Sequence, residues 1–216
     1  VSTYIGDSAL ADAWLAKTKA EGFDFKAVEC DVANWDSAVA AVAKVQAEHG
    51  PVDVLVNNAG ITRDATFKKM TPDHGHAVLR TNLDSVFNMT KQVLDGMVER
   101  GTGRVINISS INGQKGQFGQ ANYSAAKSGV HGFTMAIAQE VARKGVTINT
   151  IAPGYIGTDM VMAVPEEVRA KIIAQIPVGR LGTPEEIGGL VAYLASDLAG
   201  YITGAEYAIN GGQHMM

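Results

Sequence analysis

Short runs rich in valine and isoleucine alternate with amphipathic segments along this sequence, and this alternation restricts the fold more than any other feature. Four of the runs are FKAVEC, VDVLVNNAG, GRVINISS and GVTINTIAPG, and each is closed by polar residues or glycine. Brief β-branched runs of this kind are typical of parallel strands that are buried on both faces. We therefore predict an α/β fold with a doubly wound, mostly parallel sheet, covered by helices on both faces.

The segments between the runs carry helix start signals. Asn34 and Asp36 are both candidate N-caps for the helix through AVAAVAKVQAEHG. Thr71 and Thr183 each precede a proline, which is the order expected at a helix start because the missing proline N–H is harmless there. The sequence contains no linker, repeat or low-complexity stretch, so we predict one domain over residues 1–216.

The composition excludes several classes of protein. With 46% hydrophobic and 19% charged residues, a chain of 216 residues can bury a sizeable core. A formal net charge of −4 gives no basic footprint, so we expect neither a nucleic-acid nor a membrane partner. No apolar run reaches the roughly 20 residues of a membrane span. The single cysteine, Cys30, is typical of a reducing compartment, and we expect a cytoplasmic protein.

Small or polar residues follow four of the predicted strands. They are Asp31, the stretch 57–60, the pair Ser109 and Ser110, and the stretch 153–154. Because ligands of open α/β sheets bind outside the carboxyl ends of the strands, this pattern indicates a long ligand across that edge.

One element of a dinucleotide-binding fold is missing from the pattern. Such a fold starts with a strand, a glycine-rich turn and a helix whose N-terminus binds the pyrophosphate. Here VSTY resembles a second strand that leads directly into DSALADAWLAKTKAEG, and Gly113, Gly116 and Gly119 have the wrong spacing for the phosphate turn. We therefore predict that this chain lacks the first βα unit, about 30 to 40 residues.

Tyr123 and Lys127 are the strongest candidates for chemistry. At positions i and i+4 of a helix they share one face, with Cβ atoms about 5–6 Å apart. A nearby ammonium is expected to lower the pKa of a tyrosine from its usual value of about 10, so that Tyr123 can exchange a proton with an alkoxide. Ser110 can donate a hydrogen bond to the same oxygen. This arrangement needs a separate hydride donor, and a nicotinamide dinucleotide suits the strand-end sites.

Several motifs together resemble those of the short-chain dehydrogenase/reductase family, in order and spacing, over essentially the whole chain: NNAG at 57–60, TNLDSVF at 81–87, Ser110, YSAAK at 123–127 and PGYIGT at 153–158. The resemblance implies a Rossmann-like fold and a catalytic tetrad of Asn82, Ser110, Tyr123 and Lys127. It also implies a cofactor site formed by Asp31, Val32, Asn58, Ala59, Gly60, Tyr123, Lys127, Pro153, Gly154, Ile156 and Thr158.

Within that family the segments GQKGQFGQANY, NNAGITRD and INGGQHM are most similar to acetoacetyl-CoA reductases of polyhydroxybutyrate synthesis. This similarity implies reduction of a 3-oxoacyl thioester to the (R)-3-hydroxyacyl-CoA by a homotetramer, with an acyl-CoA substrate held by Asp64, Gln117, Phe118, Gln120 and Tyr155. One alternative is a 3-oxoacyl-[acyl-carrier-protein] reductase of fatty acid synthesis. An alternative of another class is a non-catalytic, truncated assembly subunit, suggested by the missing βα unit.

The sequence also bears on the cofactor and on metals. Users of NADH place an acidic residue at the end of the second strand, but no acid follows VSTY before Asp7, so NADPH is favoured over NADH. His74 and His76 are two residues apart on a predicted helix and do not face each other, so we expect no metal site. Residues 155–180 are expected to form a lid, with a plain helix pair as the alternative.

Overall fold

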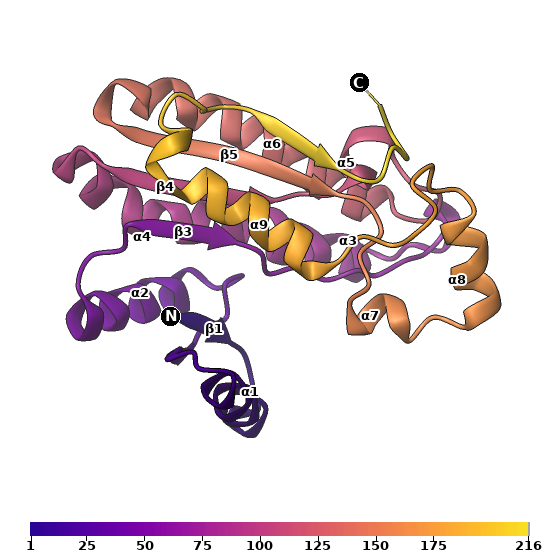
Figure 1. Cartoon of the computed structure of the whole chain (residues 1–216), viewed down its shortest axis with the longest axis horizontal. Coiled ribbons are helices and arrows are strands. Elements are labelled where there is room, and N and C mark those ends of the chain that lie inside the picture. The colour runs from indigo at the N-terminus through magenta and orange to yellow at the C-terminus, as the bar shows by residue number, and fades with distance from the viewer. Residues whose placement is uncertain (216) are drawn as a thin grey trace.

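A computed structural model describes residues 1–215, whose strands form two parallel sheets (Figure 1). The smaller sheet pairs β1 (Ser2–Tyr4) with β2 (Ala27–Glu29). The larger sheet has the order β3-β4-β5-β6, with the bounds Val54–Asn57, Gly103–Ile108, Val146–Pro153 and Glu206–Ile209. The four predicted runs contain β2, β3, β4 and β5, and VSTY contains β1. β6 is an addition that the sequence analysis did not predict.

Helices connect the strands and also follow them. In chain order they are α1 (Ser8–Ala20), α2 (Trp35–His49), α3 (Pro72–Leu79), α4 (Ser85–Arg100), α5 (Ile111–Lys115), α6 (Ala121–Val141), α7 (Asp159–Met162), α8 (Glu166–Ile173) and α9 (Pro184–Ala195). Short 3₁₀ turns lie at Phe67–Lys69 (η1), Ala142–Lys144 (η3) and Asp197–Ala199 (η4), and a π-helical turn, η2 (Arg80–Asp84), joins α3 to α4. None of the helices within residues 1–215 is both long and apolar enough to span a membrane.

The predicted helix starts are confirmed. Asn34, rather than Asp36, caps α2, because its side chain accepts a hydrogen bond of 2.9 Å from the amide of Ser37. Thr71 caps α3 in the same way, with the proline at the first helical position. Thr183 caps α9 and completes a capping box, a reciprocal pair of hydrogen bonds with Glu186 that satisfies two backbone donors at the helix start.

Helices cover both faces of the larger sheet, which confirms the predicted fold class (Figure 1). Successive residues of a strand point to opposite faces. Val105 of β4 accordingly packs in the core cluster under α4 and α6, whereas its neighbour Ile106 packs with Leu194 of α9. Burying one such aliphatic side chain contributes about 1.5–3 kcal/mol, so these two clusters fix which side of each strand faces which helix.

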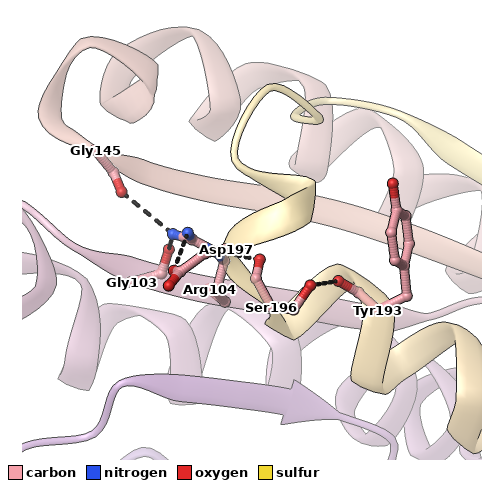
Figure 2. A network of polar contacts seen from close by, with 6 residues as sticks. All are labelled: Gly103, Arg104, Gly145, Tyr193, Ser196 and Asp197. Carbon is pink, nitrogen blue, oxygen red and sulfur yellow. Dashed lines mark hydrogen bonds and ion pairs between the residues drawn. The ribbon is translucent and has the colours of Figure 1, made fainter.

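Arg104 holds the amino end of the sheet to the turn after α9 (Figure 2). Its guanidinium donates to the carbonyl oxygens of Gly103, Gly145 and Ser196, at 3.0, 3.4 and 3.5 Å, and it lies 3.5 Å from a carboxylate oxygen of Asp197. The Arg104 side chain is only 11% exposed. One largely buried cation therefore joins β4, the start of β5 and the end of α9 at the amino end of the sheet.

The two sheets are separated by a cavity of about 710 Å³, lined by β1 on one side and β3 on the other. Within the described part of the chain, no strand lies between β1 and β3. The division agrees with the prediction that this chain lacks the first βα unit.

Candidate active site

Ser110 lies just beyond the carboxyl end of β4, where the chain turns into α5. It is the N-cap of α5, and its Oγ accepts a hydrogen bond of 3.1 Å from the amide of Asn112. Its neighbour Ser109 donates to the backbone oxygen of Lys127 at 2.8 Å, which fixes the end of β4 against α6. The Ser110 hydroxyl is thus held in place by an acceptor contact that leaves its proton free to be donated.

The first turn of α6 carries Tyr123, and its neighbour Asn122 anchors that turn. The Asn122 side chain donates to the carbonyl oxygens of Arg63 and His74 and accepts from the amide of Tyr123, at 3.1, 3.0 and 2.8 Å. Asn122 is therefore a positioning residue that connects the loop after β3, α3 and α6. Sequence reasoning did not single it out, although a buried polar residue beside a candidate tyrosine was a usable signal.

Lys127 lies one turn further along α6 and is 4% exposed. Its Nζ is 5.7 Å from the centroid of the Tyr123 ring and donates to the carbonyl oxygen of Ile108 at 2.7 Å. Burial lowers the pKa of Lys127 to about 8, because the charged form loses solvation. The i, i+4 spacing thus brings the phenol and the ammonium together, as the sequence predicts.

The expected direction of the Tyr123 pKa shift is wrong for this structure. Burial is the largest influence and raises the pKa of Tyr123 above its usual value. A hydrogen bond with Ser110 lowers the pKa, and the charge of Asp64 raises it further. Desolvation outweighs the benefit expected from Lys127, whose Nζ is engaged by Ile108. Tyr123 is therefore held as the neutral phenol, the form of a proton donor.

Asn82 lies in the π-helical turn η2, a local widening that often occurs at functional sites. Its side-chain amide pairs with both backbone groups of Ile61, with two hydrogen bonds of 2.8 Å. Gly60 is flanked by the same side chain and by Lys127, since a Cβ added there would lie 3.0 Å from Asn82 Oδ1 and 3.6 Å from Lys127 Nζ. The structure thus places all four members of the expected tetrad around the carboxyl ends of β3 and β4.

A string of hydrogen bonds runs outward from Ser110. Asn112, whose amide donates to Ser110, gives its side-chain N–H to Gln120 Oε1 at 2.9 Å, and Gln120 Nε2 donates to Asp64 Oδ2 at 2.8 Å. Both polar ends of the Gln120 side chain are therefore bonded within the protein. Asp64 and Gln120, expected to bind substrate, lie beside the site but contact each other.

The remaining residues expected to bind substrate form the rim. Gln117 is exposed and Phe118 is 85% exposed, in the loop between α5 and α6. Tyr155 and Ile156 line a second cavity of about 120 Å³, together with other residues of the expected lid. That lid contains α7 and α8, and Arg169 in it donates to the carbonyl oxygens of Met162 and Val164.

The residues expected to bind the cofactor follow the carboxyl edge from β2 to β5. Val32, Asn58 and Ala59 line the large cavity, and Asn58–Gly60 are exposed. The Asp31 carboxylate accepts from the amide of Ala33 at 3.0 Å, so it is partly engaged in its own turn. The other four members lie at the carboxyl end of β5 and in the segment that follows it: Pro153, Gly154, Ile156 and Thr158.

Two of these positions have firm backbone support. The amide of Gly154 donates to Ile209 at 3.0 Å, and a Cβ at Gly154 would lie 2.8 Å from Asn210 Cα, so only glycine fits without a shift. Ile156 bridges to Gly182 before α9. The backbone after β5 is thereby held beside β6 and the start of α9.

A buried polar network beneath the site was missed by sequence reasoning. Asn57 donates to Asn107 Oδ1 at 2.8 Å, Asn107 donates to Thr134 Oγ1 at 2.9 Å, and Thr150 donates to the same hydroxyl at 2.8 Å. Three strands and α6 are thus joined through side chains of which Asn107, Thr134 and Thr150 are fully buried and Asn57 is partly buried. A fully bonded network of this kind fixes the register of the strands. The signal was present as asparagine and threonine within otherwise apolar runs.

The residues present fit the nicotinamide half of a dinucleotide. An ammonium has three donors, and within residues 1–215 Lys127 gives one of them to Ile108 and has no carboxylate partner. Hydroxyl groups of a ribose would satisfy the other two. At Gly60 a side chain would crowd that ammonium, since an added Cβ would lie 3.6 Å from Lys127 Nζ. Among the same residues, no group of three or more His, Cys, Asp or Glu side chains is placed to hold a metal ion.

A parallel, doubly wound sheet with serine, tyrosine and lysine at its carboxyl edge defines an oxidoreductase that uses a nicotinamide cofactor. A family model described as "Enoyl-(Acyl carrier protein) reductase" matches residues 1–214. The chain belongs to the short-chain dehydrogenase/reductase family, as its motifs predict.

Three relatives show which members of this family the chain is similar to. The acetoacetyl-CoA reductase of Cupriavidus necator is 61% identical over 209 residues, which are 97% of this chain and 85% of the relative. The acetoacetyl-CoA reductase of Allochromatium vinosum is 56% identical, again over 97% of this chain and 85% of the relative. The 3-oxoacyl-[acyl-carrier-protein] reductase FabG of Vibrio cholerae is 48% identical over 90% of this chain and 80% of the relative.

Proposed function

We propose that this protein reduces acetoacetyl-CoA to (R)-3-hydroxybutyryl-CoA with NADPH, as a step of polyhydroxybutyrate synthesis. The single observation that carries the chemistry is the cluster of Ser110, Tyr123 and buried Lys127 at one edge of the sheet. The choice of substrate is supported by the names of the more similar relatives, at 61% and 56% identity against 48% for the carrier-protein reductase. The stereochemistry follows from the family resemblance.

Tyr123 acts as the proton donor. When bound, the nicotinamide cofactor supplies a hydride to the C3 carbonyl carbon of the substrate. The Tyr123 hydroxyl gives its proton to the carbonyl oxygen as negative charge develops there, so the carbonyl becomes a secondary alcohol. The raised pKa of Tyr123 keeps that proton in place at neutral pH. Ser110 donates a hydrogen bond to the same oxygen and stabilises the charge in the transition state.

Lys127 would hold the cofactor and return a proton to Tyr123, and Asn82 would support the backbone beside it. The two N–H groups of Lys127 that Ile108 does not engage would hold the hydroxyls of the nicotinamide ribose. Because burial brings the pKa of Lys127 to about 8, this ammonium can release a proton far more readily than an exposed lysine. Asn82 holds the backbone of Ile61 through two hydrogen bonds of 2.8 Å, and this fixes the loop after β3 beside Lys127.

NADPH is favoured by the residues at the end of β1. Asp7, the nearest acid after that strand, caps α1, since its carboxylate accepts from the amide of Ala9 at 2.9 Å. It is therefore engaged in the helix cap, and no carboxylate remains in VSTY to repel a 2′-phosphate. Initial rates with NADPH and NADH measure the preference, and faster turnover with NADH would contradict the assignment.

Replacing Tyr123 by phenylalanine tests the proposed reaction. We expect Tyr123→Phe to lower kcat by about 100-fold or more, the usual contribution of a general acid. NADPH consumption with acetoacetyl-CoA gives the rate, and Tyr201→Phe at a fully exposed tyrosine is the matched control. If Tyr123→Phe keeps more than about a tenth of the rate, Tyr123 is not the proton donor. No turnover and no NADPH binding by the unmodified chain would favour the assembly subunit.

We also propose a homotetramer located in the cytoplasm. Phe87 on α4 and Met135 on α6 remain 52% and 44% exposed, and a second copy of the chain packed on these helices would cover them. A monomeric mass in solution would contradict the tetramer. The one cysteine is a buried free thiol, which supports a reducing compartment. Cell fractionation tests the location, and recovery outside the cytoplasmic fraction would contradict it.

A further inference from the structure

After β5 the chain runs through α7 and α8 and returns just before α9 (Figure 1). Where it returns, a single residue pairs with the segment that leaves β5. The amide of Gly182 donates to the carbonyl oxygen of Tyr155 at 3.0 Å, and the carbonyl oxygen of Gly182 accepts from the amide of Gly157 at 2.9 Å. Gly182 thus forms a parallel bridge with Ile156. We call this pairing the neck.

The neck lies at residues that the proposed reaction needs. Ile156 belongs to the expected cofactor site, and Tyr155 to the expected substrate site. The two backbones approach each other closely, since a Cβ added to Gly182 would lie 2.6 Å from Ile156 Cδ1. The position of Gly182 therefore decides where the backbone of residues 155–157 lies.

An ion pair bridges the residues before and after Gly182. The Glu186 carboxylate accepts two hydrogen bonds from the Arg180 guanidinium, at 2.7 and 2.8 Å, and one from the amide of Thr183 at 2.9 Å. Arg180 also donates to the carbonyl oxygen of Leu181 at 3.0 Å. One carboxylate in the first turn of α9 therefore holds both neighbouring segments of Gly182. We call Arg180 and Glu186 the clasp.

The clasp is better suited to local positioning than to overall stability. Its side chains are 54% and 43% exposed, and exposed ion pairs contribute little to stability. A bidentate arginine–carboxylate pair nevertheless has a specific geometry. The start of α9 does not depend on Arg180, because Thr183 caps the helix and Pro184 occupies its first turn. The hydrogen bonds from Arg180 and Thr183 lower the pKa of Glu186 to about 2, so the clasp stays charged at neutral pH.

We propose that the two clasp residues are positioning residues for the reduction. They fix Gly182, and Gly182 fixes the backbone of residues 155–157, where the nicotinamide and the substrate are expected to bind; this role rests on the proposed function. A cavity of about 120 Å³ beside the neck is lined by both clasp residues, by Gly182 and by Ile156. The neck therefore has room to shift once the clasp is broken.

Arg180→Met tests the role of the clasp. It removes both hydrogen bonds to Glu186, and the cap of α9 remains, because Glu186 can still accept from the amide of Thr183. We expect kcat/KM for acetoacetyl-CoA to fall about tenfold, while the urea midpoint stays that of the unmodified chain. Arg143→Met, at an exposed arginine, is the matched control and should change neither quantity.

Amide hydrogen exchange gives a readout that does not depend on the reaction. Gly157 and Gly182 supply the two N–H groups of the neck, so their exchange in Arg180→Met should speed up at least about fivefold in the full chain without cofactor or substrate. The amide of Gly154, bonded to Ile209 outside the neck, is the internal reference. Unchanged exchange would refute the clasp and leave the proposed function standing, whereas absence of turnover in the unmodified chain would refute the proposed function itself.

A second variant shows whether the two side chains act as one unit. Glu186→Gln keeps an acceptor for the amide of Thr183 and removes the charge that pairs with Arg180. Because both substitutions act on the same contact, the double variant should lose no more than about twofold activity beyond either single one. The proposal is overturned by additive losses, by unchanged exchange at Gly157 and Gly182, or by a loss of activity that is accompanied by a lower urea midpoint, since Arg180 would then only stabilise the fold.

Discussion

Two cations lie at opposite ends of β4, Arg104 largely buried and Lys127 fully buried, and their surroundings differ. Arg104, at the amino end, gives hydrogen bonds to three carbonyl oxygens and lies beside the carboxylate of Asp197 (Figure 2). Lys127, against the carboxyl end, gives one hydrogen bond to Ile108, and no carboxylate is paired with it in the described residues. The guanidinium of Arg104 therefore uses its N–H donors within the protein, whereas the ammonium of Lys127 uses only one of its three.

This difference separates a cation whose donors are used within the chain from one that, under the proposed function, holds a ligand. A buried charge is stable only where it is paired or hydrogen-bonded. Arg104 meets that condition within the chain, so its removal is expected to weaken the structure. Lys127 does not, and the shift of its pKa to about 8 measures the free-energy cost of keeping it charged. We infer that the fold tolerates this cost because the ammonium binds the cofactor.

The largest expected effect comes from Lys127→Met, which keeps the length of the side chain and removes the charge. We expect kcat/KM to fall at least about 100-fold, because the cofactor loses its ribose contact and its orientation. We also expect the variant to be more stable than the unmodified chain at neutral pH. Urea unfolding at several pH values measures this second effect.

The stability difference should depend on pH in a defined window. The pKa of Lys127 is about 8 in the folded chain and near 10.5 when unfolded. As the pH falls from 10.5 to 8, the unfolded chain takes up a proton that the folded chain does not, so folding is progressively disfavoured. The advantage of Lys127→Met should therefore shrink by about 3 kcal/mol from pH 7 to pH 10.5. Lys144→Met, at an exposed lysine, is the control, and an equal pH dependence in both variants would contradict the assignment.

The same two ends of the sheet show what sequence can and cannot predict. Tyr123 and Lys127 were found because helical spacing alone places i and i+4 on one face. The strands were found because buried parallel strands are continuously apolar. Both signals are local. The role of Arg104 cannot be predicted from local sequence, because its acceptors at Gly145 and Ser196 are 41 and 92 residues away in the chain.

The direction of the Tyr123 pKa shift could not be predicted from the sequence for a related reason. Spacing predicts that a cation is near, but the balance between its charge and desolvation depends on how deeply both groups are buried. The pairing of Gln120 with Asp64 also requires two loops, 56 residues apart, to meet. The division of the sheet, in contrast, agrees with the missing βα unit that the order of motifs predicts.

A middle-sized effect is expected from Arg104→Met, and it should affect stability rather than catalysis. Loss of charge-assisted hydrogen bonds to partly buried carbonyls costs about 2 kcal/mol. We therefore expect a lower urea midpoint with an unchanged slope, and a kcat/KM within about twofold of the unmodified chain. Arg143→Met, at an exposed arginine, controls for the loss of charge. A large loss of activity without loss of stability would mean that the two ends of β4 are coupled, and the comparison would fail.

The smallest effect is expected from Asp64→Asn, which changes the charge near Tyr123 and keeps the size of the side chain. The charge of Asp64 raises the pKa of Tyr123 in the folded protein. Removing it should lower that pKa, so the proton donor is lost at a lower pH and the alkaline fall in kcat for reduction moves toward neutral. The pH profile of kcat measures this shift. The hydrogen bond to Gln120 can persist, because an amide oxygen still accepts from Gln120 Nε2.

The same variant separates two roles for Asp64. If the charge of Asp64 acts on the pKa of Tyr123, the pH profile of kcat moves while KM for acetoacetyl-CoA changes little. If it binds the substrate, as the family resemblance implies, KM rises and the profile stays where it is. Asp73→Asn removes an exposed carboxylate on α3 and should do neither. A shift toward higher pH would contradict the electrostatic role, because removal of a neighbouring negative charge can only favour the phenolate.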